Sequence, residues 1–377
     1  MYNFYEFFAG GGMARIGLGP GWSCVFANDI DERKARAYRD YFEGAPEWFS
    51  GDVAKIKTSD LPGVAALAWA SFPCQDLSLA GSGAGLNAER SGTFWPFWRL
   101  MQGLVREGRA PRLIVLENVY GALTSHGGAD FMAIAEALIE SEYRFGALVI
   151  DAVHFVPQSR PRIFIVAIRK EMFFTGDLLA AGPHPLWHPP VVVARSKEVE
   201  ALSPGSWLWW ALPSPPPRTQ VFADLIEENP DGVAWHPHAE TKRLLGMMSE
   251  VNLAKVKEAK ASKRRMVGAI YKRIRNGVQR AEIRFDGLSG CLRTPVGGSS
   301  RQIIMIVEGR RIRSRLLSPR EAARLMGLPE TYKLPEKYND AYHLAGDGLV
   351  VPVVRHLAEN ILEPALRRWK TQKGKAA

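Results

Sequence analysis

Two kinds of hydrophobic pattern alternate along the first 170 residues. Short apolar runs of strand length lie at 4–8, 24–28, 65–71, 112–117 and 162–168. Between the last two runs, apolar residues recur with the spacing of a helix face, at Phe131, Ile134, Ala135, Leu138 and Ile139. Runs this short, without polar alternation, fit strands that are buried on both faces. Strands alternating with helices predict an α/β fold with a doubly wound, parallel sheet.

The pattern changes after about Glu171. Nine prolines fall between Pro183 and Pro217, and four tryptophans lie among or beside them. Because so many prolines disfavour long helices and central strands, we expect a boundary into a smaller, irregular region. Helical and strand signals return at 318–326 and 350–366.

Charge separates one segment from the rest of the chain. The 377 residues are 46% hydrophobic and 23% charged, an ordinary globular balance that excludes global disorder and a collagen-like repeat. The net charge is +10, yet residues 240–316 alone hold 19 Lys/Arg against 6 Asp/Glu. A basic excess confined to one segment indicates a polyanionic partner such as nucleic acid, with a solvated basic face as the alternative.

The remaining composition excludes several other classes. Three cysteines without a C-x-x-C pair, and eight histidines without metal-ligand spacing, predict no metal site. The odd number of cysteines fits free thiols in a reducing compartment. No apolar run reaches 18 residues and the first residues lack a basic n-region, so we expect neither a membrane span nor a secretory signal.

The first candidate for ligand binding is the run FAGGGMA at 8–14, directly after a predicted strand. Successive glycines allow a tight turn and a close approach to a ligand, although the run is neither a strict G-x-G-x-x-G nor a P-loop. Asp29 ends the next strand run, where a carboxylate can bind both ribose hydroxyls, and Asp52 could meet an adenine amino group. Together these residues indicate an adenosine-containing cofactor, with a plain turn as the alternative.

Three further motifs carry candidate chemistry. Cys74 follows an apolar run, at the end of a predicted strand, which is where doubly wound sheets place their binding sites. Its thiolate would be a nucleophile, and the alternative is an inert thiol packed in the core. Glu117 ends another strand run and would point into the same crevice, unless it is a helix N-terminal carboxylate. Arg160 and Arg162 alternate at a strand start and suit phosphate, carboxylate or carbonyl recognition, with a surface pair as the alternative.

Taken in order, these motifs resemble those of the C5-cytosine DNA methyltransferase family. The resemblance rests on FAGGGMA, NDID (28–31), GDV (51–53), PCQ (73–75), ENV (117–119), QSRPR (158–162), SPREAARLMGLP (318–329) and AGDGLVVPV (345–353). It implies a Rossmann-like, mostly parallel, S-adenosylmethionine-dependent methyltransferase sheet at 1–180. It also implies a smaller, irregular target-recognition domain at 181–313, and a C-terminal segment, 314–377, that completes the catalytic domain.

The resemblance assigns roles to the motif residues. Cys74 would attack C6 of a cytosine flipped out of duplex DNA, Glu117 would bind its N3 and amino edge, and Arg162 would hold its O2. Arg160 would support this catalytic site or a nearby phosphate. S-adenosyl-L-methionine would give its methyl group to C5 and leave as S-adenosyl-L-homocysteine, without a metal. The implied cofactor contacts are Phe8, Ala9, Gly10, Gly11, Gly12, Met13, Asp29, Ile30, Asp52, Val53, Pro73, Phe94 and Gly348.

The resemblance also implies two sets of DNA contacts. The Gly-, Ser- and Ala-rich segment 75–90 resembles the loop that closes over the flipped base, with contacts from Gln75, Ser78 and Arg90. In the recognition region, cationic side chains could contact phosphates or guanine edges, and the sequence does not show which of them contacts which group. These side chains are Arg264, Arg265, Lys272, Arg273, Arg275, Arg280, Arg293 and Arg301.

Two motifs depart from the family pattern. The late Gly-Asn-Ser-Val block reads Gly346-Asp347-Gly348-Leu349 here, so we expect altered cofactor affinity and place no weight on Asp347 as a contact. The Asp-x-Arg-Gly run near the end of the loop reads Glu89-Arg90-Ser91-Gly92, with its arginine one position earlier.

The resemblance therefore implies an active DNA (cytosine-5-)-methyltransferase of bacterial or phage type, acting in restriction-modification or in an orphan or phage role. Duplex DNA would be its partner, with a cognate restriction endonuclease acting independently, and the enzyme would be a cytoplasmic, nucleoid-associated monomer. The same chemistry on tRNA and a catalytically inactive DNA-binding relative are the alternatives. The insert of roughly 140 residues between the QSRPR and SPREAARLMGLP motifs favours DNA over tRNA as the substrate. The presence of Cys74, Glu117 and Arg162 argues against a catalytically inactive relative.

Overall fold

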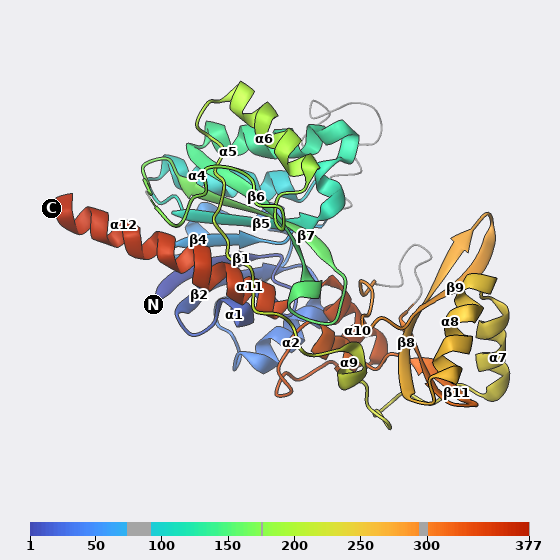
Figure 1. Ribbon diagram of the computed structural model, residues 1–377. Helices are drawn as coiled ribbons and strands as arrows, with labels where there is room; N and C mark the ends of the chain where they lie inside the picture. Colours follow the sequence, from blue (N-terminus) through green and yellow to red (C-terminus); the bar gives the residue numbers. More distant parts are fainter. Residues whose placement is uncertain (74–91, 175, 294–300, 377) are drawn as a thin grey trace. The chain divides into compact units, whose positions relative to one another are not determined.

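The computed structural model describes residues 1–73, 92–174, 176–293 and 301–376 (Figure 1). The chain forms two compact units. The first unit consists of residues 1–151, 161–215 and 353–377, and the second of residues 152–160 and 216–352.

A seven-stranded sheet forms the middle layer of the first unit, with the order β3-β2-β1-β4-β5-β7-β6. Neighbours from β3 to β5 are parallel, whereas β7 is antiparallel to both β5 and β6. The predicted doubly wound, mostly parallel sheet is thus confirmed. The order reverses between β1 and β4, and such a reversal opens a binding crevice at the carboxyl ends of the strands. The strands are β1 (Tyr2–Phe7), β2 (Trp22–Asp29), β3 (Trp48–Ser50), β4 (Leu67–Ala70), β5 (Leu113–Val119), β6 (Tyr143–Asp151) and β7 (Pro161–Arg169).

Helices cover both faces of this sheet (Figure 1). Among the described residues of the first unit before residue 216, the helices are α1 (Met13–Leu18), α2 (Glu32–Tyr41), α4 (Phe94–Arg106), α5 (Ala129–Glu140) and α6 (Pro190–Leu202). At the end of the chain follow α11 (Val351–Leu357) and α12 (Glu363–Ala376). The core between helices and sheet is rich in aromatic side chains, including Phe7, Phe97 and Trp98. Strands buried on both faces explain why the sequence showed uninterrupted apolar runs.

Helix α6 corrects one expectation from the sequence. It runs for 13 residues inside the proline-rich stretch, where we predicted no long helix. Pro189 is its N-cap residue and Pro190 occupies the first turn, where no helical N–H is required, while Pro204 lies beyond its end. The prolines delimit this helix rather than interrupt it.

The second unit contains an ordered sheet, which corrects the expected irregular architecture. Its four antiparallel strands have the order β11-β10-β8-β9. They are β8 (Arg265–Arg275), β9 (Val278–Arg284), β10 (Ile303–Glu308) and β11 (Arg311–Leu316). The helices of this unit are α7 (His238–Gly246), α8 (Glu250–Ala261), α9 (Pro319–Leu325) and α10 (Tyr338–Asp347). Leu244 of α7 and Val256 of α8 share a core with Ile270, Ile283 and Met305 of the sheet.

The division into units differs from the domain boundaries expected at 180/181 and 313/314. Residues 181–215 belong to the first unit, because Trp207 packs on Phe131 and Phe145 and the Leu208 N–H donates to the Phe145 carbonyl at 2.7 Å. Residues 314–352 belong to the second unit, where β11 pairs with β10. From residue 353 onward the chain is again part of the first unit.

Candidate active site

The glycine-rich run forms a tight turn between β1 and α1. Gly10 and Gly12 have φ values of 55° and 77°, and Phe8 also lies in the left-handed region at 56°. A Cβ atom on Gly12 would come within 2.4 Å of the Phe42 ring and 2.9 Å of the Tyr38 ring. Glycine is therefore required at position 12 by both backbone conformation and packing.

Asp29 fixes this turn from the end of β2. One carboxylate oxygen accepts the Gly10 N–H at 2.8 Å, and the other accepts the Asp31 N–H at 2.9 Å. The side chain is buried, with 9% exposure, and each oxygen retains a second lone pair. A carboxylate held in this way beside a glycine turn fits the two hydroxyls of a ribose. The Ile30 side chain that follows is 71% exposed and offers apolar surface suited to an adenine ring.

The end of β3 completes the candidate cofactor site. The Asn28 amide donates to the carbonyls of Phe49 and Gly51, at 3.1 and 2.9 Å, and so ties β2 to this end. Asp52 is exposed and uses one oxygen to cap the next turn through the Ala54 N–H, at 2.9 Å. These contacts place Asp52 and Asp29 at neighbouring strand ends, as a nucleoside requires.

The other predicted cofactor contacts fall in different surroundings. Ala9, Gly11, Met13 and Val53 are buried, and Pro73 is exposed at the exit of β4. Phe94 lies in the core with 3% exposure, stacked on Trp98 at 5.7 Å between ring centroids, and Gly348 belongs to the second unit. Direct contact of this set with a cofactor stays a prediction.

Two of the predicted catalytic side chains meet between β5 and β7. The Arg162 Nε atom lies 3.4 Å from a Glu117 carboxylate oxygen. The antiparallel register explains the contact, because Arg162 pairs with Val119, two residues after Glu117. The two side chains are 17% and 11% exposed, so the pair is mostly shielded from water but still accessible. A carboxylate and a guanidinium side by side can bind the donor and acceptor edges of a polar heterocycle.

Asn118 connects this pair to the strand that leads into the PCQ motif. Its side-chain amide donates to the Phe72 carbonyl at 3.0 Å, and its own oxygen accepts the Val119 N–H at 2.8 Å. Asn118, the central residue of ENV, had no predicted role. The predicted nucleophile Cys74 lies just outside the described residues, and so do the predicted DNA contacts Gln75, Ser78 and Arg90.

Arg160 does not share the surroundings of Arg162. It is 3% exposed within the second unit, where its guanidinium donates to the carbonyls of Gly346 and Gly348 at 2.9 Å each, and of Leu292 at 3.2 Å. The two arginines therefore contact different groups, and the division between the two units falls between them, after Arg160. Supporting the catalytic site is a role of Arg160 that stays a prediction. The Asp347 side chain is exposed and is not needed for these backbone contacts.

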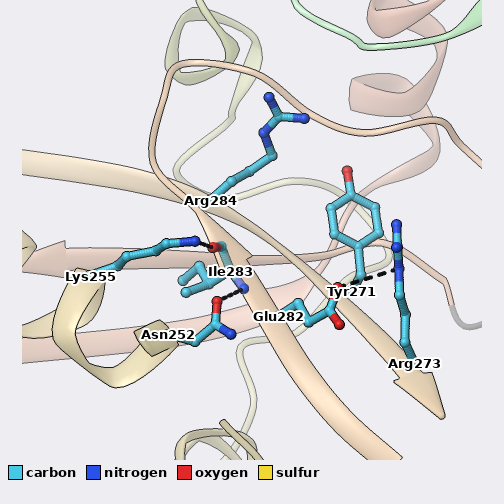
Figure 2. A pocket seen from close by; sticks show the side chains of 7 residues that line it. All are labelled: Asn252, Lys255, Tyr271, Arg273, Glu282, Ile283 and Arg284. Atoms are coloured by element: carbon cyan, nitrogen blue, oxygen red, sulfur yellow. Dashed lines mark hydrogen bonds and ion pairs between the residues drawn. The ribbon is translucent and has the colours of Figure 1, made fainter. Parts of the chain in front are cut away.

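The cations of the second unit differ in their surroundings. Arg265 pairs with Glu228 at 3.5 Å, and Arg301 contacts Asn339 and lies over the Tyr338 ring. Arg273 and Arg275 both pair with Glu282 on β9, and Figure 2 shows the first of these pairs. Lys272 is half-buried on β8, and Arg264 and Arg293 are exposed.

A buried polar cluster beneath the glycine turn was missed at the level of sequence. Glu6 of β1 is 1% exposed, and its carboxyl group receives the Arg15 N–H at 3.4 Å and the Tyr38 hydroxyl at 3.5 Å. Arg15 also pairs with Glu47. Burial raises the pKa of Glu6 to about 8, although Arg15 opposes the shift. The sequence feature that could have predicted this cluster is the position of Glu6, a charged residue inside the apolar run 4–8.

Two classes of feature are absent from the described part of the chain. It contains no group of three or more His, Cys, Asp or Glu side chains that could hold a metal ion. None of its helices combines the length and the apolar character that crossing a membrane requires.

Comparison with known proteins gives the chain a family. The model of the family described as C-5 cytosine-specific DNA methylase matches residues 2–363. The type II methyltransferase M.HhaI of Haemophilus parahaemolyticus is 25% identical over 367 residues, which cover 95% of this chain and 94% of the relative. M.HpaII of Haemophilus parainfluenzae is 26% identical over 382 residues, covering 96% and 89%.

Solved structures share the fold at lower identity. The Dnmt2 methyltransferase of S. pombe superposes with a TM-score of 0.59 at 18% identity, covering 97% of this chain and 99% of that one. A putative DNA modification methyltransferase encoded within an E. coli prophage gives a TM-score of 0.58 at 16% identity, covering 97% and 100%. With the family match over nearly the whole chain, the protein belongs to the C-5 cytosine-specific DNA methylase family.

Proposed function

We propose that this enzyme methylates C5 of a cytosine flipped out of a specific duplex DNA sequence, through a covalent bond between Cys74 and C6. The observation that carries the proposal is the Glu117–Arg162 pair, joined through Asn118 to the residues immediately before Cys74. The Cys74 thiol, the Glu117 carboxyl group and the Arg162 guanidinium are together the groups that addition to a pyrimidine ring needs.

Each group has a defined task in the reaction. The Cys74 thiolate attacks C6, and the electron pair displaced from the C5–C6 bond makes C5 nucleophilic. Glu117 binds the N3 and amino edge and stabilises the charge on the ring, while Arg162 binds O2. After C5 has gained the methyl group, it loses its proton to water, the C5–C6 double bond forms again, and the Cys74 thiolate leaves. Extrusion of the base from the stack costs a few kcal/mol, which contacts with the DNA must offset.

S-adenosylmethionine fits the first-unit site as the methyl donor. When bound, it supplies a methyl group activated by the sulfonium. Asp29 would hold the ribose, Ile30 and Asp52 would frame the adenine, and the turn from Phe8 to Gly12 would hold the methionine part. The buried carboxylate beside an exposed apolar side chain supports this assignment.

Trapping with 5-fluorocytosine tests the covalent route. Fluorine in place of the C5 hydrogen leaves no proton to lose, so elimination stops and a denaturant-resistant protein–DNA adduct should accumulate. We expect this adduct with the wild-type protein and with Cys291→Ser, a change in a half-buried thiol. We expect no adduct with Cys74→Ser, and Glu117→Gln should lower kcat by roughly 100-fold or more.

Labelled methyl transfer to duplex DNA and to tRNA tests the substrate. Duplex DNA should accept the label, and bisulfite sequencing of that DNA should reveal one methylated motif. Transfer to tRNA alone would refute the DNA substrate, and transfer to neither would refute an active enzyme. Wild-type activity in Cys74→Ser would exclude the covalent mechanism.

A further inference from the structure

One face of helix α2 lies against the glycine turn, residues 8–12. Side chains four residues apart share a helix face, and Lys34, Tyr38 and Phe42 have this spacing on α2 and just after its end. A Cβ atom on Gly12 would clash with the rings of Tyr38 and Phe42. A Cβ atom on Gly10 would lie 3.9 Å from Cδ of Lys34, in ordinary contact with it. The aliphatic stem of Lys34 therefore extends over Gly10.

The position of Lys34 on its helix directs the ammonium group toward Asp29. Lys34 is the third residue of α2 and is half-buried. Helical side chains lean toward the N-terminus of their helix, and α2 follows the end of β2, where Asp29 accepts the Gly10 N–H at 2.8 Å. The Arg33 guanidinium holds the pKa of the Asp31 carboxyl below its usual range, and the Lys34 ammonium adds a smaller effect in the same direction. The ammonium group is thus close to the start of α2.

Local electrostatics do not explain a lysine at this position. The N-terminus of a helix carries partial positive charge, so a cation in the first turn is unfavourable there. The carboxylate next to it, Asp31, already pairs with Arg33 at 2.8 Å. A lysine placed against the helix dipole, with its stem on a glycine turn, is better explained by an anion that the turn receives from outside.

The cofactor of the proposed function carries such an anion. In that assignment the glycine turn holds the methionine part of S-adenosylmethionine, which ends in a carboxylate. The buried Asp29 carboxylate beside the turn repels a second carboxylate unless a cation offsets it. Arg15, the other cation that reaches this region from α1, pairs with Glu47. Lys34 is therefore well placed to neutralise the cofactor carboxylate.

We propose that Lys34 binds the carboxylate of the methionine part of the cofactor, while Asp29 holds the ribose. This inference rests on the proposed function for the identity of the cofactor. A hydrogen bond between an ammonium and a carboxylate is charge-assisted, and the flexible lysine stem lets the ammonium follow the ligand. S-adenosylmethionine and S-adenosylhomocysteine share this carboxylate. Lys34 thus strengthens the binding of substrate and product equally, without selecting between them.

Isothermal titration calorimetry without DNA tests this contact. The ligands are S-adenosylmethionine and decarboxylated S-adenosylmethionine, which lacks only the carboxylate. The test variant Lys34→Met keeps an unbranched stem and removes the charge, and the matched control Arg36→Met removes an exposed cation from the same helix. Lys34→Met should raise the Kd of S-adenosylmethionine roughly tenfold and should not weaken binding of the decarboxylated ligand. Arg36→Met should change either Kd by less than about twofold.

Two further ligands separate a carboxylate contact from a structural role of Lys34. S-adenosylhomocysteine should lose the same factor of roughly ten in Lys34→Met, because it retains the carboxylate. 5′-Methylthioadenosine, which has the adenosine and no amino-acid part, should bind the variant and the wild type equally. A matching loss for this fragment would show that Lys34 acts through Asp29 or the fold of the turn, and would overturn the inference.

The remaining outcomes distinguish the inference from the proposed function. An unchanged Kd of S-adenosylmethionine in Lys34→Met, or equal weakening with and without the carboxylate, would overturn the role of Lys34. Cofactor binding and DNA methylation by the wild type would still support the proposed function. Wild-type protein that binds S-adenosylmethionine but methylates no DNA would refute the proposed reaction, and the ligand series would still decide the role of Lys34. Wild-type protein that does not bind S-adenosylmethionine would refute both.

Discussion

At the scale of single residues, Asp29 joins the glycine turn to the start of α2 and leaves lone pairs for a ligand. Asp29→Ala should lower the affinity for S-adenosylmethionine roughly 10- to 100-fold, because it removes charge-assisted hydrogen bonds. Isothermal titration calorimetry without DNA measures this directly. The matched control is Asp31→Ala, which deletes the N-cap hydrogen bond to the Arg33 N–H, at 2.9 Å. It should cost about 1 kcal/mol of stability and leave cofactor affinity unchanged; an equal loss of affinity in both variants would contradict the role of Asp29.

Glu6 should make stability depend on pH in a definite direction. Its pKa is raised from 4.5 to about 8 by burial, so between these values the folded chain holds a proton that the unfolded chain has lost. This contribution is complete below about pH 4.5 and is lost as the pH rises through about 8. Glu6→Gln removes the titrating group at nearly the same shape. Urea unfolding should therefore show the variant gaining stability relative to the wild type from pH 5 to pH 8, and a constant difference would contradict the assignment.

At the scale of elements, helix α9 shows how a local signal and a buried ion pair work together. Ser318 accepts the Glu321 N–H at 3.1 Å, Glu321 accepts the Ser318 N–H at 2.7 Å, and Pro319 occupies the first turn. The same carboxylate binds Arg315 through two contacts of 2.6 and 2.8 Å, and both side chains are fully buried. The Glu321 carboxylate thus caps the N-terminus of α9 and neutralises the buried Arg315 guanidinium on β11.

Removal of that carboxylate should destabilise the second unit. Glu321→Ala leaves Arg315 buried without its counter-charge, so the free energy of unfolding should fall by about 3–5 kcal/mol in chemical denaturation. The control is Glu240→Ala, which breaks the exposed pair of Glu240 with Arg243 on α7, at 2.8 Å. That change should cost at most about 1 kcal/mol. Similar losses in both variants would mean that burial does not set the strength of the Arg315 pair.

At the scale of the whole molecule, each of the two units has its own hydrophobic core. The candidate cofactor site around Asp29 is built from strand ends of the first unit, whereas the basic strands β8 and β9 belong to the second. The second core contains Leu244, which is fully buried, and its cluster includes no residue of the first unit.

A cavity in the core of the second unit should therefore weaken DNA binding without weakening cofactor binding. Leu244→Ala should cost about 2–5 kcal/mol and increase hydrogen exchange within residues 238–316. Binding of short duplex DNA should weaken, while affinity for S-adenosylmethionine measured without DNA should change by less than about threefold. An equal loss of cofactor affinity would show that the two units are energetically coupled.

The sequence by itself determined the doubly wound, mostly parallel sheet and the family of the enzyme. Strands buried on both faces produce uninterrupted apolar runs, and polar residues at their carboxyl ends are candidate site residues, so Asp29 and Glu117 could be predicted as such without coordinates. The family followed from short motifs because their glycines, carboxylates and arginines are fixed by local backbone geometry and chemistry.

Only the tertiary structure decided the partners of side chains that are distant in sequence. It separated Arg160 from Arg162, linked Asn118 to Phe72 and showed Glu6 to be buried, because strand register and packing depend on the whole chain. The sheet of the second unit was missed for a similar reason, because the basic sequence of strands β8 and β9 resembles a solvated segment until the strand pairing is known. The Asn276-Gly277 pair is typical of a hairpin turn, but it predicts only the turn and not the pairing of the strands on either side. Which cations pair with carboxylates, and which extend toward a ligand, depends on the register of β8 with β9.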